Sequence, residues 1–225
     1  MERQIGGIPN PDSDNPQQLT SVEVIVPGIK PQLPMEPKER YNKIRAAGAE
    51  GAAYFIKRGI VESIKLREFF NPFSGQIVVD LGPGDTVTGY EISALSGAKA
   101  YVAVEPYYWV ECQAKFFRYD RFPANNQLKK IPHDIVEADA LSFLKRLPDK
   151  SVSIFASQME SVMKKDYEIS LGKEIQRVLH PQGAFIEFDS EFHLDKNLFQ
   201  RDLFDQNSDD SAYLYFDLEK YQLKT

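Results

Sequence analysis

Short apolar runs alternate with amphipathic stretches over the second part of the chain. The apolar runs have the length of buried strands, and the stretches between them have helical periodicity. Strands are expected at 77–81, 100–105, 133–138, 151–157 and 183–189, and helices at 88–96, 107–119, 141–147 and 165–179. Continuously apolar strands separated by helices are typical of a parallel sheet that is buried on both faces. The pattern therefore predicts an α/β fold with a doubly wound, mostly parallel sheet and helices on both faces.

After the last of these strands, the pattern predicts one more helix and one more strand. The helix is expected at 194–204, and the run AYLYFDLEKY at 212–221 alternates as a final edge strand does. Its direction is left open, although antiparallel edge strands are common on such sheets.

The leader, residues 1–38, is set apart by its prolines. Seven of the 14 prolines fall in the first 37 residues, and each fixes φ and removes a backbone donor. An extended or disordered leader is therefore expected. Within it, SVEVIVPG at 21–28 has three interpretations: a short strand, a stretch that docks on the domain, or part of a mobile tail.

A helical extension is expected over residues 39–72, followed by a Rossmann-like domain over 73–225. Glycines near 48–51 suggest two helices with a break between them, and Asn71-Pro72 should end the second helix. The extension is a candidate lid, in which Tyr41 and Tyr54 would contact a substrate. The alternative is an ordinary helix that packs against the sheet.

Composition and charge narrow the classes of partner. The chain has 225 residues, of which 42% are hydrophobic, and a net charge of −6. This balance disfavours nucleic acid, whose binders carry clustered Lys and Arg. Cys112 is the only cysteine, so no internal disulfide forms, and no His or Cys spacing indicates a metal site. With neither a signal peptide pattern nor a long apolar run, a cytoplasmic protein without membrane contact is expected.

The candidate chemistry follows the ends of the predicted strands, because ligands of open α/β sheets bind there. In VVDLGPGDT, Gly82 and Gly84 form a turn that lets the backbone approach a ligand. Glu105 ends the second strand, where a carboxylate can accept hydrogen bonds from both hydroxyls of a ribose. Alternatively, Glu105 only begins a helix, with Pro106 in its first turn.

Asp139 follows the third strand and has two interpretations. Its carboxylate could bind the amino group of a purine, or it could cap the helix that follows, since Asp is a favoured N-cap. A nicotinamide-binding G-x-G-x-x-G would need glycine where Val87 stands, and no G-x-x-x-x-G-K-[ST] loop is present. A dehydrogenase and a nucleoside triphosphatase are therefore disfavoured.

Four motifs in this order resemble class I S-adenosylmethionine-dependent methyltransferases. VVDLGPGDT is similar to their motif I, YVAVEP and EADA to their ribose and adenine positions, and EIQRVLHPQGAFI (174–186) to their helix and loop before the fifth strand. The resemblance covers about half of the chain. It implies S-adenosylmethionine as cofactor, bound by Asp80, Gly82, Gly84, Glu105, Pro106, Asp139 and Ala140.

The chain also departs from the family pattern. Thr86 stands where a third glycine is frequent, Gln182 replaces a loop glycine, and one predicted strand follows the fifth where the family usually has two. The first departure could change the affinity for the cofactor, and the second is a variant of the turn. The third indicates a reduced or remodelled substrate side.

The acceptor is expected to be a small molecule. SQMES after the fourth strand lacks the Asn-Pro-Pro-Tyr type signature of amino-group methylation, and Cys112 lies in a predicted helix, which disfavours a cysteine nucleophile. Gln158 and Glu160 follow the fourth strand and are candidate substrate contacts. Glu160 and His193 are the candidate catalytic groups, with an ordinary exposed loop histidine as the alternative for His193.

Two other functions stay open at this point. A non-catalytic protein of this fold could bind S-adenosylmethionine or another nucleoside as a regulatory partner. An NAD-dependent oxidoreductase is the weaker alternative.

Overall fold

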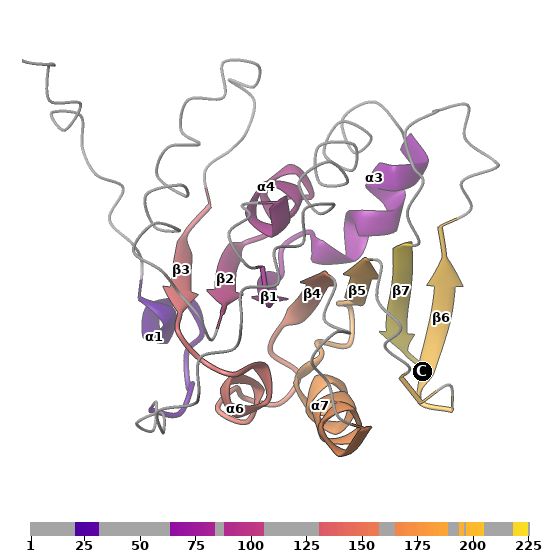
Figure 1. The fold of residues 1–225 in the computed structure, drawn as a ribbon. Coiled ribbons are helices and arrows are strands. Elements are labelled where there is room, and N and C mark those ends of the chain that lie inside the picture. Colours follow the sequence, from indigo (N-terminus) through magenta and orange to yellow (C-terminus); the bar gives the residue numbers. More distant parts are fainter. Residues whose placement is uncertain are drawn as a thin grey trace, which may run out of the picture.

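The computed structural model describes residues 21–31, 64–83, 88–105, 131–157, 165–188, 194–195, 197–204 and 218–224. Its strands form a seven-stranded sheet in the order β3-β2-β1-β4-β5-β7-β6 (Figure 1). The strands are β1 (Ile77–Leu81), β2 (Ala100–Val104), β3 (His133–Val136), β4 (Ser153–Ser157), β5 (Phe185–Phe188), β6 (Phe199–Leu203) and β7 (Leu218–Leu223). The helices are α1 (Val22–Ile25), α3 (Ile64–Phe70), α4 (Thr88–Leu95), α6 (Ala140–Leu144) and α7 (Lys165–Val178), with a 3-10 turn at Asn71–Phe73.

Strands β1 to β5 run parallel, whereas β7 runs antiparallel to β5 and β6 antiparallel to β7. A parallel pair needs a crossover, and a helix usually supplies it. The order reverses between β1 and β4, as in other doubly wound sheets. The predicted doubly wound, mostly parallel α/β fold is confirmed.

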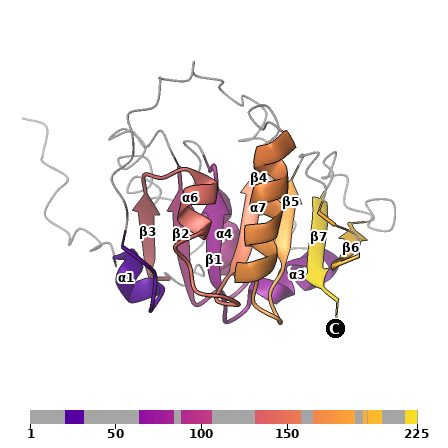
Figure 2. The ribbon, with the colours of Figure 1, turned by 90° about the horizontal axis from the view of Figure 1, so that it is seen from below.

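Two apolar layers cover the sheet because successive strand residues point to opposite faces. On β1, Ile77, Val79 and Leu81 pack in the layer with α1, α6 and α7, whereas Val78 packs in the layer with α3 and α4. Figures 1 and 2 show these two sets of helices on opposite sides of the sheet. All five residues of β1 are buried, so this central strand holds both layers together.

The end of the chain corrects the sequence prediction. Residues 199–203 form strand β6, so a helix over 194–204 is wrong. The final strand is antiparallel, but β7 lies inside the sheet and β6 forms the edge. Pairing outweighs the local helix propensity here, because residues 199–203 pair with β7 along their whole length and Phe199 is buried in the core. Two strands therefore follow β5.

Residues 21–31 dock on the domain. Val22, Ile25 and Val26 are buried in the layer with α6 and α7, and the Val22 N–H donates to Asp134 Oδ2 of β3 over 2.7 Å. One helical turn places these three apolar side chains on one side and leaves Val24 68% exposed. The docking interpretation is confirmed, and the short strand is wrong; the rest of the leader lies outside the described residues.

Helix α3 is the described part of the helical extension. It ends at Phe70, and Asn71 and Pro72 continue into the 3-10 turn, as the sequence predicts. Leu66, Phe69 and Phe70 are buried against the sheet. Residues 39–63, with Tyr41, Tyr54 and the predicted break, lie outside the described residues.

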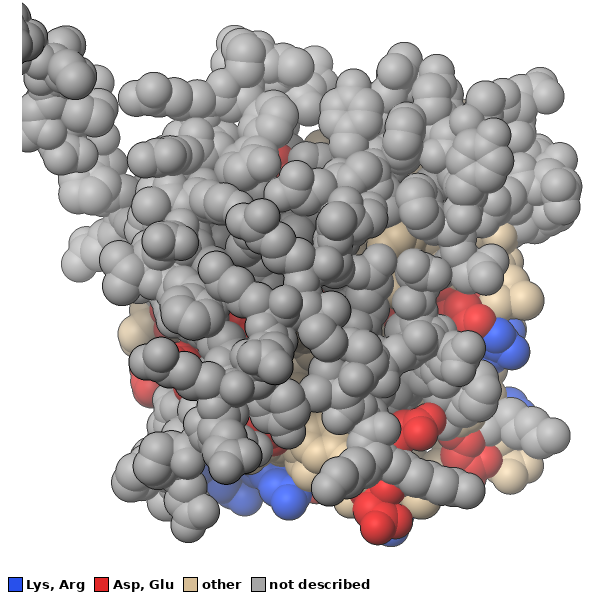
Figure 3. Space-filling model, in the orientation of Figure 1, with Lys and Arg blue, Asp and Glu red and all other residues tan. Residues whose placement is uncertain are grey.

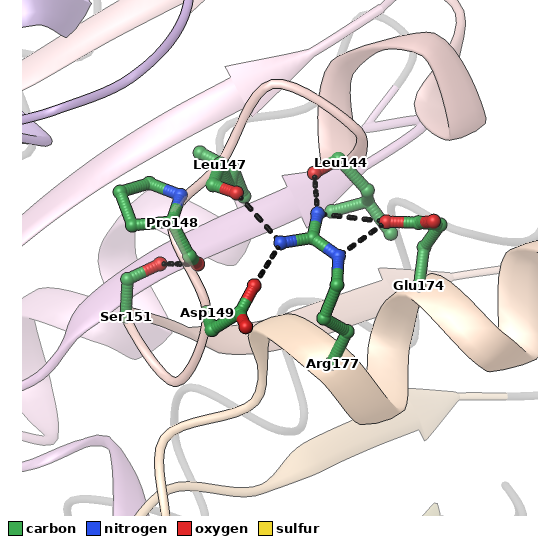
Figure 4. Close-up of polar contacts among 7 residues, drawn as sticks. All are labelled: Leu144, Leu147, Pro148, Asp149, Ser151, Glu174 and Arg177. Carbon is green, nitrogen blue, oxygen red and sulfur yellow. Dashed lines mark hydrogen bonds and ion pairs between the residues drawn. The ribbon is translucent and has the colours of Figure 1, made fainter.

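A fully paired arginine lies near the amino ends of the strands (Figure 4). Arg177, in the last turn of α7, donates from Nη1 to Leu147 O and to Asp149, each within 2.8 Å. Its Nη2 contacts Leu144 O at 2.8 Å and Glu174 at 2.7 Å, and its Nε donates to Glu174 at 2.8 Å. The guanidinium has five N–H donors, and each has a partner. Arg177 of the EIQRVL run thus ties α7 to the end of α6, and Glu174 of the same run holds its guanidinium.

Candidate functional site

The carboxyl ends of β1 and β2 bring the first two predicted site residues together. Leu81 pairs with Val104 across these strands, and the next residues are Gly82 and Glu105. The Gly82 N–H donates to Val104 O over 2.9 Å, and the Glu105 N–H donates to Val136 O of β3 over 3.1 Å. Gly82 has φ of +71°, a left-handed conformation that glycine adopts without steric cost. The turn and the candidate ribose carboxylate are therefore neighbours at one edge of the sheet.

Asp80 is the buried acid of this edge. Its side chain is 1% exposed, and Oδ2 accepts a 2.6 Å hydrogen bond from the hydroxyl of Tyr101 on β2. Its second oxygen, Oδ1, has no hydrogen-bond partner among the described residues. Buried polar atoms are nearly always paired in native proteins. Oδ1 is thus an acceptor that the described part of the chain leaves unused.

The environment of Asp80 changes its ionisation. Burial raises the pKa of Asp80 from 3.8 to about 7, against the hydrogen bond from Tyr101, which lowers it, and with the charge of Glu105, which raises it further. Burial and the neighbouring Asp80 also raise the pKa of Tyr101 well above its ordinary value. Tyr101 therefore stays protonated and remains the donor, whereas Asp80 titrates near neutral pH.

Gly89 permits the close approach of Asp80 to α4. A Cβ placed on Gly89 would lie 1.8 Å from Asp80 Oδ2 and 2.7 Å from Asp80 Cγ. Only glycine therefore fits at this position of the first helical turn without displacing the carboxyl group. The sequence reasoning missed Gly89, although an isolated glycine inside a helical pattern often has a packing reason.

Asp139 is the N-cap of α6. Its Oδ1 accepts from the Ser142 N–H over 3.0 Å, and its Oδ2 accepts from the hydroxyl of Tyr167 on α7 over 2.8 Å. That hydroxyl also accepts from the Leu141 N–H over 3.2 Å. The capping interpretation is confirmed, and the purine interpretation stays a prediction. Ala140 follows as the first helical residue, with its side chain buried in the core.

A second buried carboxylate was also missed by the sequence reasoning. Glu187 of β5 is fully buried opposite Glu219 of β7, and the single proton of the Tyr221 hydroxyl lies between them, with the oxygen 2.5 Å from Glu219 and 3.2 Å from Glu187. Burial raises the pKa of Glu219, but hydrogen bonds, first that from Arg201, lower it below its usual value. Here the carboxylates have donors of their own, in contrast to Asp80 Oδ1.

The other predicted site residues lie outside the described part of the chain: Gly84, Pro106, Gln158, Glu160, His193, Tyr41 and Tyr54. Their roles stay predictions. Among the described residues, no group of three or more His, Cys, Asp or Glu side chains could hold a metal ion. No helix in the described ranges combines the length and the apolar character that crossing a membrane requires.

Comparison with known proteins gives similarity in structure alone. No family model matches the sequence, and no curated protein matches it. A putative methyltransferase from Streptococcus mutans in complex with SAH has a TM-score of 0.47 and 13% identity over 70% of this chain and 95% of that one. A putative methylase from Haemophilus influenzae has a TM-score of 0.47 and 15% identity over 76% of this chain and 99% of that one. An rRNA methylase from Streptococcus thermophilus has a TM-score of 0.47 and 12% identity over 71% of this chain and 94% of that one.

The fold itself is assigned from strand order and direction. Five parallel strands in the order β3-β2-β1-β4-β5, extended by antiparallel β7 and then β6, form a doubly wound, Rossmann-like α/β fold. The predicted fold class is confirmed, and the activity is argued below from the residues of this chain.

Proposed function

We propose that this chain is an S-adenosylmethionine-dependent methyltransferase. The observation that carries the proposal is the arrangement at the carboxyl ends of β1 and β2, where the Gly82 turn, the unused Asp80 Oδ1 and Glu105 lie together. Ligands of doubly wound sheets bind at this edge. The two carboxylates can accept hydrogen bonds from an amino group and from vicinal hydroxyls of a ligand. The glycine turn lets such a ligand lie close to the backbone.

The residues present fit this cofactor part by part. Asp80 Oδ1 is a buried acceptor to which no described residue donates, which suits the ammonium group of the methionine part. Glu105 is half-buried beside Gly82, where its carboxylate can accept from ribose hydroxyls. Asp139 already accepts from Ser142 and Tyr167, so binding of the purine amino group there would share or displace the Tyr167 hydroxyl.

When bound, the cofactor supplies an electrophilic methyl group on a sulfonium. The contribution of the protein is to hold the nucleophile and the methyl carbon in line and to exclude water, because orientation alone removes a large part of such a barrier. A general base is needed only for an acceptor that loses a proton, such as a hydroxyl. Glu160 and His193 remain our candidates for that role.

We further propose a small-molecule acceptor. The net charge of −6 opposes binding to a phosphate backbone. Figure 3 shows both acidic and basic side chains of the described residues on the face drawn. The rRNA methylase among the structural neighbours makes RNA the acceptor class to be tested against.

Calorimetric titration with S-adenosylhomocysteine tests the cofactor, and Glu105→Ala is the diagnostic variant. We expect the variant to bind more weakly by about 1 to 3 kcal/mol, since ligand hydroxyls lose an acceptor. Glu137→Ala is a matched control, because Glu137 is an exposed glutamate at the end of β3. An absence of binding by the unaltered protein, or tighter binding of NAD, would contradict the proposal.

Transfer of labelled methyl groups tests the acceptor. We expect label in the small-molecule fraction of a cell extract and none in the RNA fraction. Label in RNA would overturn the small-molecule acceptor while keeping the methyltransferase. Cofactor binding without transfer to any fraction would favour the non-catalytic alternative.

A further inference from the structure

We propose that Tyr101 is a positioning residue, which holds one oxygen of Asp80 so that the other faces a cationic ligand, and that ligand binding thereby expels one proton from Asp80. This inference deepens the proposed function and rests on it for the identity of the ligand. Asp80, not Tyr101, would contact the ligand.

The geometry around Asp80 assigns different tasks to its two oxygens. Oδ2 is held from two sides, by the Tyr101 hydroxyl at 2.6 Å and by the backbone of α4 at Gly89, where a Cβ would overlap it. Oδ1 is buried and has no described hydrogen-bond partner. A carboxylate held at one oxygen cannot rotate freely, so Oδ1 has a fixed direction and the ligand has to supply its donor.

Tyr101 is itself held in place. Its side chain is fully buried, and the ring of Tyr90 on α4 packs against it edge to face at 5.6 Å between centroids. Tyr90 also packs edge to face on His133 at 5.0 Å, and its hydroxyl accepts from the Ile131 N–H over 3.3 Å. A tyrosine fixed by packing is a suitable support for a group that needs a defined direction.

The charge near Asp80 comes from few elements. On β2, Tyr101 lowers the pKa of Asp80 through its hydrogen bond, and Glu105 raises it through its charge, while burial is the largest influence. Phe155 of β4, the partner of Asp80 in the sheet, is apolar. Among the described residues, Tyr90 and Glu91 of α4 and His133 of β3 are further titratable side chains near this layer, and Lys220 of β7 lies over the ring of Phe69 in it.

A cationic ligand would change this balance. Below a pH of about 7 the free protein carries a proton on Asp80. An ammonium group at Oδ1 favours the ionised carboxylate, so the complex forms with release of that proton to solvent. The association constant should then rise by up to about tenfold per pH unit below this pKa and level off above it.

Titration calorimetry between pH 5.5 and 8.5 tests the inference. The probes are S-adenosylhomocysteine, which has an amino group, and 5′-methylthioadenosine, which lacks the amino-acid part. For the unaltered protein, we expect the affinity for the first probe to rise with pH and the affinity for the second to stay level. Asp80→Asn should abolish the rise.

Tyr101→Phe is the decisive variant. Loss of its hydrogen bond raises the pKa of Asp80, so the inflection of the affinity profile should move to higher pH and the affinity at high pH should recover. Tyr221→Phe is the matched control, because it also removes a buried tyrosine hydroxyl that donates to carboxylates, but on β7. It should leave the inflection in place.

The outcomes separate the inference from the function beneath it. A Tyr101→Phe profile that is parallel to the unaltered one, or a level profile for the unaltered protein, overturns the positioning role. If S-adenosylhomocysteine does not bind at any pH, the proposed function fails and the proton-linked binding fails with it. In that case, the unfolding free energy measured at several pH values tests the support of Asp80 by Tyr101. The support is confirmed only if Tyr101→Phe shifts the pH at which stability is lost to a higher value.

Discussion

Two polar side chains, Arg177 near the amino ends of the parallel strands and Asp80 at their carboxyl ends, differ in how their polar atoms are paired. At the amino ends, Arg177 has a partner for each of its N–H donors and joins α6 to α7. At the carboxyl ends, Asp80 is more deeply buried and keeps one oxygen without a described partner. A fully paired group contributes to stability, whereas an unpaired buried acceptor costs free energy until a donor arrives. Arg177 therefore connects two helices, whereas Asp80 is placed to bind a ligand.

Asp80 should produce the largest effect in this comparison, and it should depend on pH. Because its pKa is raised from 3.8 to about 7 in the folded protein, the folded state binds more protons than the unfolded state between these values, and stability is lost as the pH rises through 7. Relative to the unaltered protein, Asp80→Asn should gain roughly 4 kcal/mol in unfolding free energy between pH 4 and pH 8. Chemical denaturation at several pH values measures this gain. A pH-independent difference would show that Asp80 is ionised throughout and would break the comparison.

The Arg177 cluster should show the second largest effect. Arg177→Ala leaves two carbonyl groups at the end of α6 and the carboxylate of Glu174 without their donor, and we expect a loss of about 3 kcal/mol in unfolding free energy. Lys173→Ala removes an exposed cation from the same helix and should change the unfolding free energy by less than about 0.5 kcal/mol. Binding of S-adenosylhomocysteine should be unchanged in both variants. A loss of affinity in Arg177→Ala alone would mean that the two ends are coupled.

Gly89→Ala should cost about 2 kcal/mol, because the added methyl group displaces Asp80 from Tyr101. Gly172→Ala on α7 is the matched control: its Cβ would meet Leu194 at 3.4 Å, an ordinary contact, so the better helix propensity of alanine should prevail. Thermal unfolding distinguishes the two. Equal effects of both substitutions would remove the steric argument for Asp80.

Asp139 should give the smallest effect. Asp139→Ala removes the N-cap of α6 and should cost about 1 kcal/mol, whereas Asp139→Asn keeps a capping oxygen and most of the stability. If the purine interpretation also holds, Asp139→Asn should still weaken S-adenosylhomocysteine binding. Unchanged affinity in Asp139→Asn would show that Asp139, like Arg177, contributes to stability and not to cofactor binding.

Periodicity was sufficient for the parts of the fold whose burial is regular along the chain. The strands around Asp80 and Glu105 and the long helix α7 have such regular patterns, and the structure agrees with them. Strand β6 has one buried residue, Phe199, so its pairing with β7 is not visible in its own sequence. The docked turn at 21–31 was equally ambiguous, because its helical form depends on which side chains the domain buries.

The site was predictable only in part, for a related reason. Glycines and acids that follow strands can be read in order, which identified Gly82 and Glu105. The contacts that define their chemistry join residues far apart in sequence: Tyr101 is 21 residues from Asp80, and Tyr167 is 28 from Asp139. Such contacts depend on how the layers pack, and periodicity does not encode that.

The two outer strands of the sheet also bear on self-association. An unpaired strand edge can act as a template for intermolecular β-pairing. On β6, whose outer side no described strand covers, Gln200, Arg201 and Asp202 are exposed, and side chains of mixed charge make such an edge a poor template for fibril growth. At the opposite edge, β3 is short and contacts α1, to which Asp134 is hydrogen-bonded. The same turn that completes the core thus also packs against the strand at this edge of the sheet.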